Sequence, residues 1–105
     1  MINIRVSRIS PEKVELLRSW LAEAGERAAE VKATLVDEGV RHERALLVDT
    51  SDGPLLIYAV ECDDIEAALA VFAKSAHPID AEHKRVMAEV GGTPVAVEEL
   101  FDVRL

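Results

Sequence analysis

The order of the chain's apolar patterns limits the folds it can form more than any other feature. Period-two alternation or a short apolar run marks four segments as β-structure: Ile2–Ile9, His42–Asp49, Leu55–Cys62 and Val95–Leu105. Apolar residues at spacings of three and four predict helix over Pro11–Glu38 and Ile65–Val90. The predicted order is therefore strand, helix, strand, strand, helix, strand.

This βαββαβ order is typical of the ferredoxin-like α+β fold, an antiparallel sheet with helices on one face only. A chain of 105 residues is expected to form one domain, residues 1–105. The segment Leu55–Val60 is apolar at every position, which is typical of a strand buried on both faces. Because the helices cover only one face of this central strand, we expect a second copy of the sheet to cover the other. The sequence thus predicts a homodimer.

Local signals refine the boundaries of these elements. Ile2, Ile4 and Val6 alternate with polar residues, so their side of the first strand is expected to pack on the core. The Asp52-Gly53 pair has the turn chemistry of a hairpin between the second and third strands.

Two interruptions are expected within the helical regions. Gly25 bends the first region or splits it in two. His77-Pro78 interrupts the second, because proline disfavours helix for the residue before it. Asp80 is a plausible cap for the segment that follows, and with His77 and His83 it forms a cluster at spacings of three. This cluster is interpreted as a helix junction rather than a metal site.

Composition excludes several classes of partner. The net charge is −8, from 20 acidic and 12 basic residues, so the surface repels phosphate backbones and nucleic-acid binding is not expected. No apolar run is long enough to span a bilayer, and no membrane partner is expected. The first residues show no apolar signal-peptide region, and the single cysteine, Cys62, has no partner for an internal disulfide. We therefore expect a cytoplasmic protein.

Three stretches of the sequence resemble the dimeric α/β-barrel superfamily, and the L-rhamnose mutarotase branch in particular. The stretches are 37–40 (DEGV) leading into 45–49 (ALLVD), 55–61 (LLIYAVE) and 94–101 (PVAVEELF). The likeness covers roughly residues 26–103, and the Glu-Glu-Leu-Phe ending is its most specific part. The chain is also similar to a short actinobacterial family without an assigned activity.

The resemblance implies a homodimer in which two ferredoxin-like sheets enclose a ligand cavity, but it does not imply one activity. The superfamily includes mutarotases, polyketide cyclases and small monooxygenases. The mutarotase branch places a catalytic His in the first helix, where this chain has Ala24. Its paired Trp residues in the second helix are also missing, since the only Trp here is Trp20. We therefore do not expect this chain to have mutarotase activity.

Few polar side chains stand on the otherwise apolar strands, and these are the candidate catalytic residues. They are Glu99, Glu43, Tyr58 and Arg5, together with His83 from the second helical region. A charge on the helix-facing side of the sheet is costly unless it is paired. The candidate site is therefore expected between the open face of the sheet and its rim. The alternatives remain open: an Arg5–Glu99 ion pair, core packing of Tyr58, and a half-buried His83 over the sheet.

Two functions are compatible with this pattern. The first is a cofactor-independent isomerase or cyclase, in which a strand carboxylate or a histidine moves a proton on a small organic molecule. Tyr58 or Arg5 would then orient an oxygen of that molecule. The alternative is a non-catalytic small-molecule-binding or assembly protein whose dimer interface fills the open face. No metal and no cofactor are expected, and the sequence does not identify the substrate.

Overall fold

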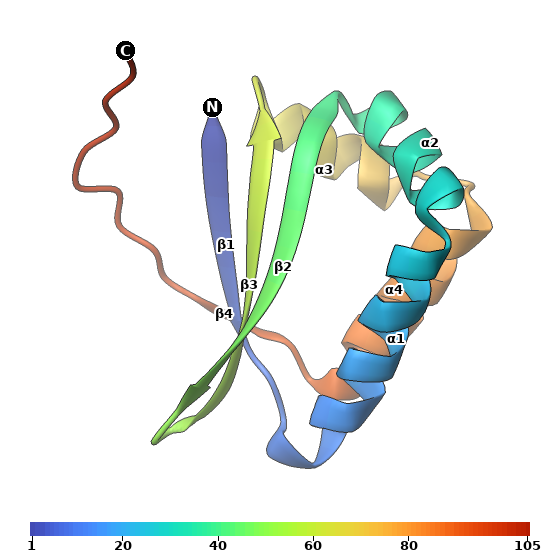
Figure 1. Ribbon diagram of the computed structural model, residues 1–105, viewed down its shortest axis with the longest axis vertical. Coiled ribbons are helices and arrows are strands. Elements are labelled where there is room, and N and C mark those ends of the chain that lie inside the picture. The colour runs from blue at the N-terminus through green and yellow to red at the C-terminus, as the bar shows by residue number, and fades with distance from the viewer.

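A four-stranded antiparallel sheet forms one layer of the computed structural model, which describes residues 1–105 (Figure 1). The strands are β1 (Ile2–Arg8), β2 (Val40–Thr50), β3 (Gly53–Cys62) and β4 (Thr93–Val95). They lie in the order β2-β3-β1-β4, with β3 and β1 in the centre. The predicted ferredoxin-like α+β fold is confirmed. The hairpin turns at Gly53, whose φ of 114° is a conformation that glycine adopts readily.

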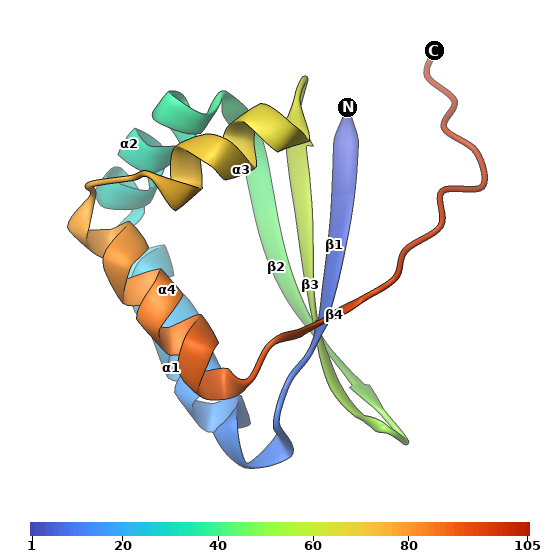
Figure 2. The ribbon, with the colours of Figure 1, turned by 180° about the vertical axis from the view of Figure 1, so that it is seen from behind.

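Four helices form the second layer and cover one face of the sheet (Figures 1 and 2). They are α1 (Val14–Glu26), α2 (Ala28–Glu38), α3 (Ile65–Ala73) and α4 (Pro78–Val90). A short 3₁₀ turn, Pro11–Lys13, leads into α1. In both views α1 lies beside α4, and α2 lies beside α3. None of the helices has both the length and the apolar composition needed to cross a membrane.

The helical breaks differ slightly from those expected. The break between α1 and α2 falls at Arg27, two residues beyond Gly25. The Arg27 guanidinium binds Glu30 on α2 at 2.7 Å and Glu82 on α4 at 2.8 Å, so it ties the junction to α4. The predicted interruption at His77-Pro78 is confirmed, since α4 begins at Pro78.

The register of the sheet shows which side chains face the helices. Arg5 pairs with Tyr58 and Asn3 with Val60, so the polar side of β1 faces the same way as the buried residues of β3. The expectation that Ile2, Ile4 and Val6 pack on the core was therefore wrong. These three residues lie on the open face, with Ile2 64% and Ile4 43% exposed. Alternation with period two defines two faces of a strand but not which one meets the helices.

The open face of the sheet is apolar across its three long strands. Strand pairing places these side chains on it: Ile2, Ile4, Val6, Leu46, Val48, Leu55, Ile57 and Ala59. Leu46 and Val48 are exposed, at 41% and 37%. A continuous apolar patch of this kind is typical of an interaction surface.

The C-terminal segment forms much less strand than predicted. Strand β4 contains only Thr93–Val95, which pair with Val6–Arg8 of β1, and residues 96–105 form no regular structure. The tail runs beyond β1 on the side away from the helices (Figures 1 and 2). Its large apolar side chains are exposed, Leu100 at 84% and Phe101 at 81%. A strand needs a neighbour for its backbone hydrogen bonds, and the tail has none within this chain.

Two clusters of buried side chains hold the helices on the sheet. One contains Ile9, Leu17, Leu56 and Val90, and the other Val40, Val60, Cys62 and Ala68. Tyr58 packs against both clusters and so lies between them.

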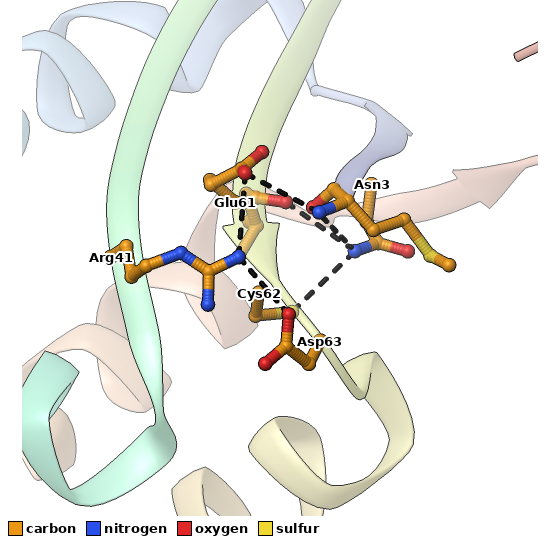
Figure 3. A network of polar contacts seen from close by, with 7 residues as sticks. Asn3, Arg41, Glu61, Cys62 and Asp63 are labelled. Atoms are coloured by element: carbon orange, nitrogen blue, oxygen red, sulfur yellow. Dashed lines mark hydrogen bonds and ion pairs between the residues drawn. The ribbon is translucent and has the colours of Figure 1, made fainter. Parts of the chain in front are cut away.

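A polar network fastens the end of the sheet near the N-terminus (Figure 3). The amino group of Met1 and the guanidinium of Arg41 both bind Glu61 Oε1 at 3.3 Å, and Arg41 also binds Asp63 at 3.1 Å. Asn3 Nδ2 donates to Val60 O at 3.4 Å. These surface contacts join the ends of three strands.

Candidate functional site

A cavity of about 510 Å³ lies between the helices and the sheet. Its walls are mostly apolar and come from all three long strands and all four helices. The polar groups on its wall are Arg5, Ser7, Thr34, Glu38, Glu43, Tyr58, Asp80, His83 and Lys84. A mostly apolar cavity of this size with a few polar groups is typical of a small-molecule site.

The wall of the cavity carries a hydrogen-bonded pair. Tyr58 Oη and His83 Nε2 lie 2.8 Å apart, and the tautomer of the imidazole decides which of them donates. Tyr58 extends from the central strand β3, and His83 extends from α4 one turn after Asp80. The strand and the helix are both fixed by the buried clusters, so this pair is rigidly placed.

Aromatic rings surround His83. The ring centroids of Trp20 on α1, Tyr58 on β3 and Phe72 on α3 lie 6.2, 5.9 and 5.5 Å from the imidazole. Three of the chain's four aromatic residues therefore meet at one histidine. This apolar setting has a chemical consequence: burial lowers the pKa of His83, so the imidazole is neutral at pH 7.

Burial also perturbs the two groups on the strands. It raises the pKa of Tyr58, and the nearby Glu43 charge raises it further, so the phenol keeps its proton at neutral pH. The pKa of Glu43 itself is raised, first by burial and then by the charge of Asp80. A carboxylate with a raised pKa is a better proton acceptor than an ordinary one.

Two further acids line the cavity. Asp80 is only 5% exposed, and its Oδ2 has no hydrogen-bond partner. Glu38, at the end of α2, has its pKa raised to about 7 by burial and by the charges of Asp80 and Glu43. Sequence reasoning treated Asp80 as a helix cap, but its side chain caps nothing. The spacing of three between Asp80 and His83 was the signal that placed both on one side of α4.

The structure brings four of the five candidate residues together and leaves one outside. Arg5, Glu43, Tyr58 and His83 all line the cavity. Glu99 is exposed in the C-terminal tail, outside the cavity, and makes no ion pair with Arg5.

The site was expected between the open face of the sheet and its rim, whereas the cavity lies on the helix-covered face. A charge on that face is costly only where the interior is filled. Arg5 and Glu43 instead border an open space, which spares them full burial in apolar packing.

Of the His77, Asp80 and His83 cluster, only His77 lies at a helix junction, since Asp80 and His83 line the cavity. His77 Nε2 lies 2.6 Å from Asp37 Oδ2, and this pair joins the end of α2 to the start of α4. The Asp37 carboxylate raises the pKa of His77 by accepting this hydrogen bond. No group of three or more His, Cys, Asp or Glu side chains in the chain is arranged to hold a metal ion.

Comparison with known proteins gives the family. The profile of DUF6176, a family of unknown function, matches residues 2–102. The chain belongs to this family. It also matches a protein from Arabidopsis thaliana named provisionally as U-box domain-containing protein 42, with 34% identity over 95 residues. That match covers 88% of this chain, and the chain spans only 9% of the relative.

Two solved structures share the fold. One is named provisionally as an antibiotic biosynthesis monooxygenase from Deinococcus radiodurans, with 16% identity and a TM-score of 0.50 over 98% of this chain and 97% of that one. The other is tetracenomycin F2 cyclase from Streptomyces glaucescens, a type-II polyketide cyclase. It is 25% identical, with a TM-score of 0.50 over 100% of this chain and 94% of that chain. The ferredoxin-like fold is thus shown, while the likeness to the mutarotase branch stays a prediction.

Proposed function

We propose that the protein is an enzyme that moves a proton on a small aromatic carbonyl compound, as an isomerase or a cyclase does. The observation that supports this most strongly is the Tyr58–His83 pair in an apolar cavity, with Glu43 on the neighbouring strand. The cavity volume of about 510 Å³ suits a ligand of two or three fused rings. The likeness to a polyketide cyclase supports the same class of reaction.

Each polar group has a distinct role in this proposal. Glu43 accepts a proton from the carbon next to the carbonyl group, because its raised pKa makes it a suitable base. Tyr58 donates a hydrogen bond from its phenolic O–H to the carbonyl oxygen, on which negative charge develops. His83 is a positioning residue: its Nε2–H donates to Tyr58 Oη and leaves the phenolic proton free for the substrate. Arg5, which pairs in register with Tyr58, orients a second oxygen.

The proposal includes a homodimer formed through the open face of the sheet. That face is apolar across β1, β2 and β3, and it opposes the face that carries the cavity. Pairing two such faces removes apolar surface from water at about 25 cal/mol per Å². The exposed apolar side chains of the tail, such as Leu100 and Phe101, would then have a second copy to pack against. Each protomer keeps its own cavity in this arrangement.

The reaction can be tested with β-tetralone, a two-ring ketone whose acidic CH₂ group exchanges hydrogen for deuterium in D₂O. Proton NMR measures the exchange rate with and without the protein. The wild-type protein should accelerate exchange, Glu43→Gln should abolish the acceleration, and Tyr58→Phe should reduce it by about 100-fold. Arg44→Gln is the matched control, because Arg44 neighbours Glu43 but faces the open side of the sheet.

Two outcomes would contradict this assignment. Acceleration that survives Glu43→Gln unchanged would remove Glu43 from the mechanism. Tight binding of β-tetralone without any exchange would favour the non-catalytic binding protein over the enzyme.

A further inference from the structure

Asp80 is a charged group whose environment in the chain is incomplete. It lies in the first turn of α4 and lines the cavity, and only 5% of its surface is exposed. Its Oδ2 has no hydrogen-bond partner. A buried carboxylate without a partner costs free energy, so such a group is typical of a site completed by a ligand.

Glu38 and Glu43 line the same cavity and are two further carboxyl groups without a partner. Like Asp80, neither forms an ion pair or a side-chain hydrogen bond in the chain. The three carboxyl groups are close enough for their charges to raise the pKa of Glu38 and of Glu43. This end of the cavity therefore has excess negative charge and spare hydrogen-bond acceptors.

The basic side chains of this region do not supply the missing charge: Arg5 lines the cavity but forms no ion pair with these carboxyl groups, and His77 and Lys84 have other partners. His77 is bound to Asp37 at 2.6 Å, outside the cavity. Lys84 Nζ donates to Ala73 O at 3.2 Å and lies 4.9 Å over the Phe72 ring. A metal ion does not fit either, since no three potential ligands are arranged to hold one. What the carboxyl groups lack is a cationic donor with several N–H bonds, which a protonated amine supplies.

We infer that Asp80 and Glu38 form a subsite for a protonated amine of the ligand. The inference rests on the proposed function and narrows its substrate class to aromatic carbonyl compounds that carry an amine. The amine lies between α2 and α4, and the ring lies against the aromatic residues around His83. The added positive charge also favours the ionised form of Glu43, which is the form that accepts a proton.

Three indoles that differ only in charge test this subsite. They are tryptamine, a cation; tryptophol, its neutral alcohol; and indole-3-acetate, an anion. Isothermal titration calorimetry at pH 7.5 should give tryptamine about tenfold or more tighter binding than tryptophol, and no binding of indole-3-acetate. Asp80→Asn should bring tryptamine to within about twofold of tryptophol. Asp37→Asn, an acid outside the cavity, should leave the preference unchanged.

Tryptophol or indole-3-acetate binding as tightly as tryptamine would overturn the subsite. So would a tryptamine preference that Asp80→Asn leaves intact, or a failure of tryptamine to bind at all. β-Tetralone carries no amine, so its exchange reports the proposed function separately. Loss of the amine preference with exchange retained would refute only the subsite.

Discussion

Replacing Asp80 with Asn should make the protein more stable. Its buried Oδ2 has no partner, and an unpartnered buried polar group costs about 1–3 kcal/mol, more when charged. An amide at this position is still unpartnered, so the substitution removes only the part of this cost that comes from the charge. The substitution also relieves repulsion with Glu38 and Glu43. It gives up the attraction of a carboxylate to the start of α4, about 0.3–1 kcal/mol. The expected net gain in the free energy of unfolding is about 1–2 kcal/mol.

Thermal unfolding followed by circular dichroism at pH 7.5 and fixed protein concentration measures this gain. For a domain of this length, the melting temperature should rise by about 5–10 °C. Asp37→Asn is the control, because Asp37 has its partner in His77 and should lose stability slightly. If Asp80→Asn instead lowers stability by about 1 kcal/mol or more, then the carboxylate has a stabilising role and the reasoning fails.

Other regions of the chain give three further predictions. Gly53→Val should cost about 1–3 kcal/mol because φ is 114° there. Gly92→Ala should cost less than about 1 kcal/mol, because the one tight contact of its Cβ is with the flexible end of Met87 at 3.1 Å. Equal melting temperatures would refute this. In the folded protein the pKa of Glu38 is raised from 4.5 to about 7. The contribution of this group to the free energy of unfolding therefore falls as the pH rises from 4.5 to 7. Glu38→Gln should therefore stabilise the protein at pH 8 by about 1 kcal/mol after solvent screening, and urea unfolding that shows no gain would contradict it. Ile4→Glu should yield a folded monomer in sedimentation, and an unchanged dimer would exclude the open-face interface.

The sequence predicts the fold well because each element has its own local signal. The order of strand-like and helix-like apolar patterns along the chain predicts the sheet topology. The apolar run Leu55–Val60 identifies a central strand. His77-Pro78 marks the break before α4 because proline restricts the residue before it. These signals depend on a few neighbouring residues, so one sequence is enough to read them.

The remaining features depend on contacts between distant segments. The alternation in β1 shows that Asn3 and Ile4 face opposite ways, but only packing decides that the polar side meets the helices. The pattern over residues 95–105 is that of a strand, yet only Val95 of this segment pairs with β1, opposite Val6. Local periodicity carries no information on whether a partner strand exists.

The candidate site was predicted only in part, because it also depends on contacts between distant segments. Tyr58 and Glu43 were recognisable as polar groups on apolar strands, and His83 as a histidine on the inner stripe of a helix. Their meeting in one cavity, and the incomplete environment of Asp80, depend on the space left between the helices and the sheet. A sequence does not show where packing leaves a gap.

The central claim is that small molecules bind between the helices and the sheet, beside Tyr58 and His83. Two-dimensional NMR of the ¹⁵N- and ¹³C-labelled protein, titrated with β-tetralone, tests it most directly. The account predicts that the largest shifts fall on the rings of Tyr58, His83 and Phe72, with Ile4 and Leu46 on the open face unmoved. Shifts confined to the open face, or no saturable shifts at millimolar ligand, would contradict it.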